Sequence, residues 1–131
     1  MRLLLDTNIL IPLVDGAARS LPREVLALLR SDDVEMWASV ASTWEVAIKH
    51  RLGKLPLPCP PEEWPILLTN LNVAIMPVRT AHVIAAPVLP LSTKDPFDRL
   101  FIAICGVERM QLVTTDAELS SHPLAWRPSP A

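Results

Sequence analysis

Four acidic side chains stand out because of where they fall relative to the predicted strands and helices. Asp6 and Asp116 each follow a short run that predicts a buried strand, while Glu45 and Asp98 lie in the first turns of predicted helices. In a parallel α/β sheet these positions share one edge, so the four carboxylates are expected to converge on one pocket. Their mutual repulsion favours a hard divalent cation, Mg²⁺ or Mn²⁺, which can activate water and neutralise charge on a phosphoryl oxygen.

Each acid taken singly also has an ordinary structural explanation. Ser42 and Glu45 have the spacing of a capping box, and Glu45 precedes Lys49 by four residues, as in a helical ion pair. Asp98 follows a predicted N-cap, Asp95, so its charge would complement the helix dipole. Asp6 and Asp116 can each close a turn or cap a helix. These explanations do not account for the placement of all four acids at one edge.

The elements that must position these residues follow from the apolar pattern. Residues 8–14 fit a helix or a turn, and the face of the helix beginning at Ser42 carries Trp44, Ile48 and Leu52. Strands are predicted at 2–6, 34–37, 73–76 and 112–113, and helices at 22–30, 42–52, 62–71, 79–86 (capped by Thr80) and from 96 onward. Strands alternating with helices predict an α/β fold whose parallel sheet is covered on both faces.

Length and composition limit the possibilities. The chain has 131 residues, 50% of them hydrophobic, which predicts a single domain. A net charge of −2 gives no overall basic character of the kind that marks many nucleic-acid binders. No apolar run is long enough to span a membrane, and Asp6 interrupts the apolar start, so we expect a mature cytoplasmic protein. Cys59 and Cys105 are expected to be reduced thiols.

Four sequence blocks identify a family resemblance that covers essentially the whole chain. They are LLLDTNILI (3–11), SVASTWEVAIKHRLGKL (39–55), DPFDRLFIA (95–103) and LVTTD (112–116). In order and spacing they resemble the PIN-domain ribonucleases, and among these the VapC toxins of bacterial toxin–antitoxin pairs. The resemblance implies a three-layer α/β/α sandwich with a central parallel sheet, forming one domain over residues 1–131 with 128–131 as a loose tail.

The resemblance also implies an activity, which is Mg²⁺-dependent cleavage of RNA. Asp6, Glu45, Asp98 and Asp116 would form the metal site, with Mn²⁺ as a substitute ion. As a hypothesis, Asp6 and Asp98 bind the principal ion directly, while Glu45 and Asp116 act through water or hold a second ion. Many relatives have His two residues before DPFDR, whereas this chain has Thr93 there.

Other polar residues are candidates for supporting roles. Four could orient the carboxylates or the attacking water, although such residues are equally common in turns and caps: Asn8, Ser42, Thr114 and Thr115. Four more could contact RNA phosphates: Arg51, Lys54, Lys94 and Arg99. For Lys49 and His50 a solvated helix end is favoured.

Partners follow from the resemblance and from the apolar excess. A homodimer and a VapB-like antitoxin, whose tail would block the acidic pocket, would bury this surface. The four tryptophans fit packing better than base stacking. The alternative function is a catalytically silent PIN-like module that binds RNA or protein. A receiver-type phosphoacceptor is disfavoured, because paired acids after the first strand and a late strand-end Lys are missing.

Overall fold

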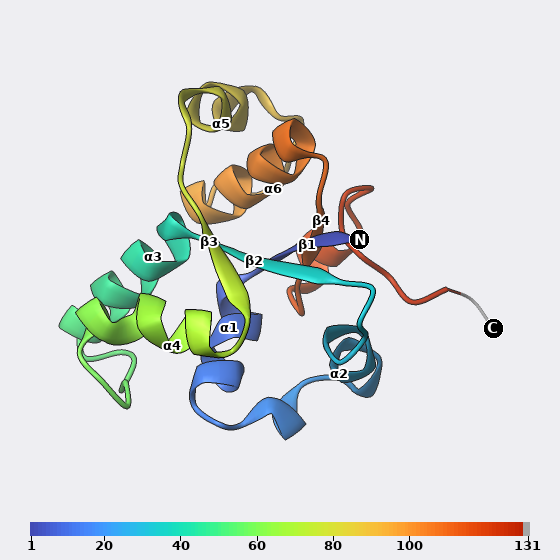
Figure 1. Cartoon of the computed structure of the whole chain (residues 1–131). Coiled ribbons are helices and arrows are strands. Elements are labelled where there is room, and N and C mark those ends of the chain that lie inside the picture. Colours follow the sequence, from blue (N-terminus) through green and yellow to red (C-terminus); the bar gives the residue numbers. More distant parts are fainter. Residues whose placement is uncertain (130–131) are drawn as a thin grey trace.

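Four parallel strands form the centre of the protein, seen here in a computed structural model that describes residues 1–129 (Figure 1). They are β1 (Arg2–Leu5), β2 (Glu35–Ser39), β3 (Val73–Met76) and β4 (Gln111–Val113). Their order across the sheet is β3-β2-β1-β4, and each neighbouring pair is parallel. The four strands predicted from the apolar runs are therefore confirmed, with β2 starting one residue later and ending two residues later than expected.

Helices connect the strands and cover the sheet. They are α1 (Thr7–Val14), α2 (Arg23–Leu29), α3 (Val40–Arg51), α4 (Trp64–Asn70), α5 (Thr80–Ala85), α6 (Pro96–Glu108) and α7 (Ala117–Ser120), with short 3-10 turns at Ala18–Ser20, Pro61–Glu63 and Ala86–Val88. In Figure 1, α5 and α6 lie on one side of the sheet, and α1, α2 and α4 lie on the other.

The alternation of side chains along β1 divides the core into two layers. Leu3 and Leu5 are fully buried in a cluster with residues of α1, α2 and α4. Leu4 points to the opposite face and is buried with residues of α6 and α7, including Phe101 and Leu119. Because successive strand residues face opposite sides, a strand buried on both faces reads as a continuous apolar run. The predicted three-layer α/β/α sandwich is confirmed.

The strand order places a crevice at the carboxyl end of β1. The chain runs from β1 outward through β2 to β3, and then returns to pair β4 with the other side of β1. Such a reversal opens a space between the two connections that leave the sheet in opposite directions. Asp6 follows β1 and Asp116 follows β4, so the fold brings these two acids to the same crevice.

The start of α3 differs from the prediction. Ser39, at the end of β2, is the N-cap, and its Oγ accepts a hydrogen bond from the backbone N–H of Ala41 at 3.0 Å. The helix start predicted at Ser42 is therefore wrong, and the capping box offered as the alternative explanation of Glu45 is not formed. The strand passes directly into the helix, so Ser42 lies within the helix and its hydroxyl is free for other contacts. Glu45 accordingly lies beyond the first turn.

Two other helix starts test the capping predictions. Asp95 caps α6 as predicted, because its Oδ1 accepts a hydrogen bond from Phe97 N–H at 2.8 Å. The predicted Thr80 cap is wrong, because Thr80 is the first residue of α5 and Arg79 is its N-cap. The N–H of Arg79 donates to Nδ1 of the buried His82 at 2.9 Å, so the side chain of the third helical residue satisfies the N-cap N–H.

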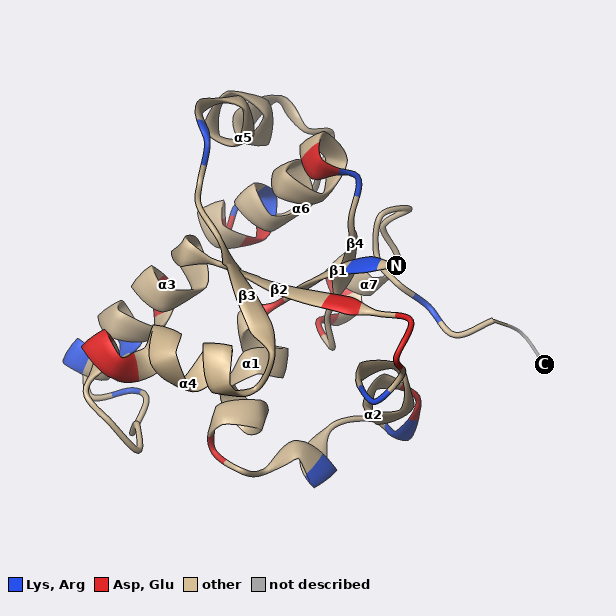
Figure 2. Ribbon diagram, in the orientation of Figure 1, with Lys and Arg blue, Asp and Glu red and all other residues tan. Residues whose placement is uncertain are grey.

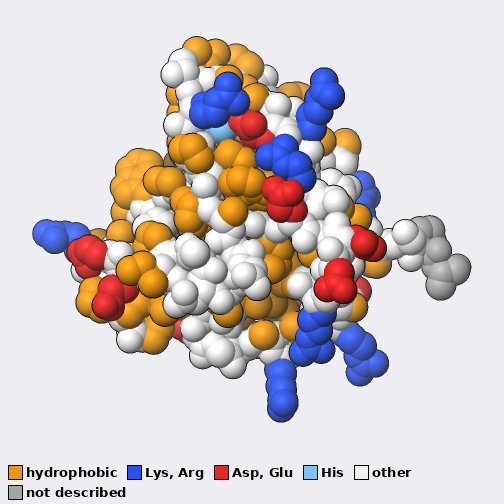
Figure 3. All heavy atoms as spheres, in the orientation of Figure 1, with side chains coloured by type: hydrophobic (Ala, Val, Ile, Leu, Met, Phe, Trp, Pro, Cys, Tyr) orange, Lys and Arg blue, Asp and Glu red, His pale blue; other side chains and the backbone are white. Residues whose placement is uncertain are grey.

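The apolar face of α3 does not lie in the core. Trp44 is 62% exposed and Leu52 is 61% exposed, whereas the buried residues of α3 are Ala41, Ser42 and Val46. Figure 3 shows hydrophobic side chains gathered on the surface over the space between α3 and α5. The helix therefore uses its small residues for packing inside the domain and presents large apolar residues outward.

Further observations concern the cysteines, membrane-spanning helices and the C-terminal residues. Cys59 and Cys105 are both free thiols. Within residues 1–129 no helix is long and apolar enough to cross a membrane. The predicted loose tail begins at 128, and its last two residues, 130–131, lie outside the described residues.

Candidate active site

All four acids singled out in the sequence line one cavity. The cavity has a volume of about 200 Å³ and lies at the carboxyl edge of the sheet, bounded by α1, α3, α6 and the β4–α7 connection. Its lining comprises Asp6, Thr7, Asn8, Ile11, Glu45, Lys49, Asp95, Asp98 and Asp116. The convergence predicted from strand ends and helix starts is therefore present, and we refer to this cavity as the acidic pocket.

Asp6 lies deepest in the acidic pocket and is held at both carboxylate oxygens. Its Oδ1 accepts a hydrogen bond from Thr7 N–H at 2.7 Å, and its Oδ2 accepts one from the Thr114 hydroxyl at 2.7 Å. Burial raises the pKa of Asp6 to about 6 against these hydrogen bonds, and the charges of Glu45 and Asp116 raise it further. The carboxylate is thus fixed in orientation but destabilised in its charged form.

Glu45 reaches the pocket from the second turn of α3. The Thr7 hydroxyl donates to its Oε1 at 2.6 Å, and Lys49 Nζ donates to its Oε2 at 3.1 Å. Thr7 Oγ1 also lies 3.0 Å from the buried Ser42 Oγ. Ser42 therefore acts on the pocket through Thr7, and the i, i+4 pair with Lys49 that the sequence predicted is formed.

Asp98 lies in the first turn of α6 and faces the other acids. Its Oδ2 accepts a hydrogen bond from the Thr93 hydroxyl at 3.3 Å. Burial raises the pKa of Asp98 to about 7, and the charges of Asp95, Asp6 and Asp116 raise it as well. Burial and the neighbouring carboxylates therefore both disfavour the charged form of Asp98.

Asp116 has a structural task as well as a place in the pocket. Its Oδ1 caps α7 by accepting hydrogen bonds from Glu118 N–H at 2.8 Å and Leu119 N–H at 3.1 Å. Its own N–H donates to the Thr114 hydroxyl oxygen at 3.0 Å, so Thr114 links Asp116 to Asp6. Asp95 likewise both caps α6 and lines the pocket, whereas the sequence indicated only the cap.

Comparison with known proteins identifies the family. The sequence-family model of the PIN domain matches residues 3–123. This chain belongs to the PIN-domain family. PIN domains are typically nucleases.

Solved structures confirm the PIN fold. The chain is similar to a chain of a toxin–antitoxin complex from Klebsiella pneumoniae, with 20% identity, 98% of each chain covered and a TM-score of 0.66. It is also similar to a chain of VapBC2 from Rickettsia felis bound to a DNA fragment from its promoter. That match has 16% identity, 95% of this chain and 96% of the other covered, and a TM-score of 0.64. No curated protein matches the sequence.

The basic residues of this PIN domain are distributed differently from the prediction. Figure 2 shows Lys and Arg spread over several elements rather than gathered in one stripe. Arg51, Lys54 and Lys94 are exposed, but none of them lines the acidic pocket, and Lys94 lines the cavity between α3, α5 and α6. Lys49 lines the acidic pocket, although a solvated helix end was favoured from the sequence.

Arg99 has a structural role instead of the predicted phosphate contact. Its guanidinium donates four hydrogen bonds at 2.9–3.1 Å to backbone carbonyls of the segment that precedes α6: those of Ala86, Leu89, Leu91 and Thr93. The planar fork of an arginine suits several fixed acceptors at once. Because most of its donors are occupied, the assignment of Arg99 to RNA phosphate is wrong.

The residues predicted to orient the carboxylates divide into two groups. Asn8 lines the acidic pocket, Ser42 contacts Thr7, and Thr114 holds Asp6. Thr115 is exposed and lines a different cavity. Sequence reasoning missed Thr7. Its position directly after Asp6 could have indicated it, because the residue that follows a strand-end acid starts the next helix at the same edge of the sheet.

The donor set of the PIN domain suits a hard cation. All the acidic ligands offer oxygen, and the raised pKa values of Asp6 and Asp98 are the result of burial and repulsion that a cation would relieve. Within residues 1–129, no three His, Cys, Asp or Glu side chains converge tightly enough, as they lie, to hold one ion together. Mg²⁺ is commonly held by only one or two carboxylates and keeps several waters, so the donor set fits this ion.

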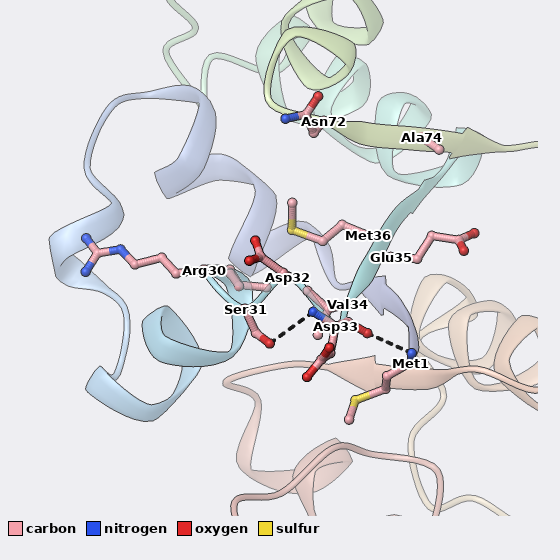
Figure 4. A pocket seen from close by; sticks show the side chains of 11 residues that line it. Met1, Arg30, Ser31, Asp32, Asp33, Val34, Glu35, Met36, Asn72 and Ala74 are labelled. Atoms are coloured by element: carbon pink, nitrogen blue, oxygen red, sulfur yellow. Dashed lines mark hydrogen bonds between the residues drawn. The ribbon is translucent and has the colours of Figure 1, made fainter.

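Size alone does not locate the site of this PIN domain. A larger cavity of about 660 Å³ lies at the opposite, amino-terminal edge of β2 and β3 (Figure 4). There Met1 donates from its terminal amine to Asp33 O at 2.9 Å, and Asp33 N–H donates to Ser31 Oγ at 3.2 Å. These are ordinary loop contacts within the β2 side of the fold.

Proposed function

We propose that this PIN domain is the toxin of a toxin–antitoxin pair and cleaves RNA at the acidic pocket. The observation that carries the proposal is the convergence of Asp6, Glu45, Asp98 and Asp116, the positions of the VapC blocks, on one cavity of a PIN fold. Two similar structures come from toxin–antitoxin complexes, which supports an antitoxin as partner.

The proposed reaction is hydrolysis of a phosphodiester bond with Mg²⁺, or Mn²⁺ in its place. Asp6 and Asp98 would hold the ion, with Glu45 and Asp116 acting through water. When bound, such an ion supplies an activated water and neutralises charge on the phosphoryl oxygen.

The other residues of the pocket keep the acids in place for this reaction. Thr114 and the N–H of Thr7 fix the plane of the Asp6 carboxylate, and the Thr7 hydroxyl fixes Glu45. Lys49 balances part of the negative charge through its 3.1 Å contact with Glu45. Because these groups are already oriented in the folded chain, little reorganisation is needed when a phosphate arrives.

The exposed basic residues support RNA binding around the pocket. Arg51 and Lys54 lie at the end of α3, and Lys94 precedes α6, so they are exposed charges next to the two helices that carry Glu45 and Asp98, although none of the three lines the acidic pocket. Contacts of this kind attract the phosphate backbone without reading sequence. Such a toxin would act in the cytoplasm, where its RNA substrate is found.

A homodimer is the second part of the proposal. A cavity of about 400 Å³ between α3, α5 and α6 is lined mainly by apolar residues that include Trp44, Ile48, Val83, Phe97 and Leu100. We call it the apolar groove. Its exposed apolar rim favours burial against a second copy of the chain. The acidic pocket would remain available to a basic side chain of the antitoxin.

A cleavage assay with a matched pair of variants tests the nuclease proposal. Purified protein is incubated with total RNA in Mg²⁺, with and without EDTA. Asp98→Asn is expected to lower the cleavage rate by about 10²–10³-fold, because it removes charge from the reacting site. Asp32→Asn, which changes an exposed acid of the opposite cavity, is expected to cleave like the wild type.

Two results would contradict the nuclease proposal. Full Mg²⁺-dependent cleavage by Asp98→Asn would show that the acidic pocket is not the reacting site. Tight RNA binding by the wild type without any cleavage would instead support the silent binding module, provided that folding is verified by circular dichroism.

A further inference from the structure

A second cavity is connected to the acidic pocket by a single residue, Thr114. It has a volume of about 230 Å³ and is bounded by the start of α2, the residues after β4, α7 and residues 126–128. Thr114 lines this cavity while its hydroxyl donates to Asp6 Oδ2 at 2.7 Å. Thr114 therefore connects the lining of this cavity to Asp6, and we call this second cavity the flanking cavity.

Trp126 provides a rigid aromatic wall in the flanking cavity. Its backbone N–H donates to Leu112 O at 2.8 Å, and the preceding Ala125 pairs with Leu112 as an extension of the sheet. The half-buried indole also packs against the hydrophobic core on the α2 side of the sheet. An aromatic ring that is already fixed loses little entropy when a base stacks on it.

Three of the other lining residues are polar and exposed, whereas Pro22, Val25 and Pro128 add apolar surface. Arg127 carries a positive charge, Thr115 a hydroxyl and Glu24 a carboxylate, and all three line the flanking cavity. A guanidinium suits a phosphate, while the hydroxyl and the carboxylate suit the hydrogen-bonding edge of a base, in particular an amino group. An apolar side chain of a protein partner would leave these groups without partners, which costs free energy.

We propose that the flanking cavity is a nucleobase subsite for single-stranded RNA, in which a base next to the cleaved bond stacks on Trp126 and an adjacent phosphate meets Arg127. The proposal rests on the ribonuclease function proposed above and adds to it the determinant of sequence preference. Trp126 is thereby a substrate-positioning residue as well as part of the core.

The test compares cleavage of an RNA library that is randomised around the preferred cleavage site. For Trp126→Ala we expect kcat/KM to fall by about 5- to 100-fold through KM, because one stacked base contributes about 1–3 kcal/mol. We also expect base preference to flatten at a single position beside the cleaved bond. Preferences at the other positions should remain.

Two further variants separate stacking from folding and from charge. Trp126→Phe keeps an aromatic ring, so it should fold and retain part of the preference; it carries the test if Trp126→Ala does not fold. Arg127→Ala should weaken binding on all sequences alike and lower the salt dependence by about one phosphate contact. Arg30→Ala, at the opposite edge of the sheet, is the matched control and should change neither property.

The outcomes are distinguishable from those of the nuclease proposal. If the wild type cleaves RNA and folded Trp126 variants keep the same KM and base preferences, the subsite is refuted while the nuclease function stands. If those variants lose antitoxin binding instead, the cavity belongs to the protein partner and the proposal is also refuted. An absence of cleavage by the wild type refutes the nuclease function and the subsite with it.

Discussion

The acidic pocket and the apolar groove are built by neighbouring residues of the same two helices. On α3, Trp44 lines the groove and Glu45 lines the pocket; on α6, Phe97 lines the groove and Asp98 the pocket. Trp44 and Phe97 meet edge to face, with ring centroids 5.3 Å apart. On each helix, two adjacent residues therefore point to different surfaces, one to the acidic pocket and the other to the apolar groove.

The two regions differ in how much the fold itself fixes them. Each acid of the pocket is tied to its surroundings by hydrogen bonds, and burial together with charge repulsion raises the pKa of Asp6 and Asp98. The large side chains of the groove leave much of their surface exposed, as Trp44 does at 62%. The pocket is therefore formed in the isolated chain, whereas the groove gains its main free energy only when a partner covers it.

Arg99 lies between these regions, and its replacement gives the largest expected effect on stability. Arg99 lines the groove, while its bond to Thr93 O holds the residue whose hydroxyl contacts Asp98. Arg99→Lys keeps the charge but cannot span four carbonyls, so we expect the free energy of unfolding to fall by about 2–4 kcal/mol. Urea unfolding measures this fall, with Arg30→Lys as an exposed control expected to stay within about 0.5 kcal/mol. Equal midpoints for the two variants would show that the four bonds contribute little.

The pocket could be predicted from the sequence because its position depends on where parallel strands end and the following helices begin. Strand-end acids such as Asp6 and Asp116 meet wherever parallel strands are adjacent, and helices start at the same edge, where Glu45 and Asp98 were expected. The N-caps and the hydrogen-bond partners of individual side chains were less predictable. Ser39 displaced Ser42 as the N-cap of α3 because the turn between strand and helix has no intervening residue, and local spacing does not reveal that turn.

Arg99 and the face of α3 show what a linear pattern cannot contain. A basic residue beside Asp98 looks the same in the sequence whether it meets a phosphate or folds back on carbonyls up to thirteen residues away. Apolar residues at helical spacing normally indicate a core-facing stripe. Here the stripe carrying Trp44 faces outward, and the buried residues of α3 are Ala41, Ser42 and Val46.

Replacement of Trp44 tests whether the groove is an interface. Trp44→Ser is expected to raise the dissociation constant of the homodimer by at least about tenfold, since exposed aromatic residues are frequent anchors of interfaces. Monomer stability should change by no more than about 1 kcal/mol, mostly from the lost ring contact with Phe97. Analytical ultracentrifugation measures the association.

Ile66 offers a matched control for this prediction. It is 61% exposed, close to the value for Trp44, but it lies on α4. Ile66→Ser should leave the dissociation constant unchanged. A comparable loss of association in both variants would show that general surface hydrophobicity, and not the groove, drives self-association.

The smallest expected effect is the pH dependence of folding stability that arises from the carboxylates of the acidic pocket. The pKa values of Asp98 (about 7) and Asp6 (about 6) lie above the value of 3.8 for an ordinary aspartate. Between about pH 4 and pH 7 the folded chain therefore holds protons that the unfolded chain has released. The contribution to stability is fully present below about pH 4 and is lost as the pH rises through the folded-state values.

Asp98→Asn removes one of these titrating groups, so its Tm in EDTA should fall less between pH 5 and pH 8 than that of the wild type. The corresponding difference in the free energy of unfolding between the two proteins should be below about 1 kcal/mol, because the Asp98 carboxylate is partly exposed and solvent screens its charge. At pH 8, Mg²⁺ should raise the Tm of the wild type more than that of the variant, because binding to the folded state stabilises it. Differential scanning calorimetry measures both changes, with Asp32→Asn as the control. Parallel pH profiles for wild type and Asp98→Asn would show that the repulsion in the pocket is already relieved by solvent.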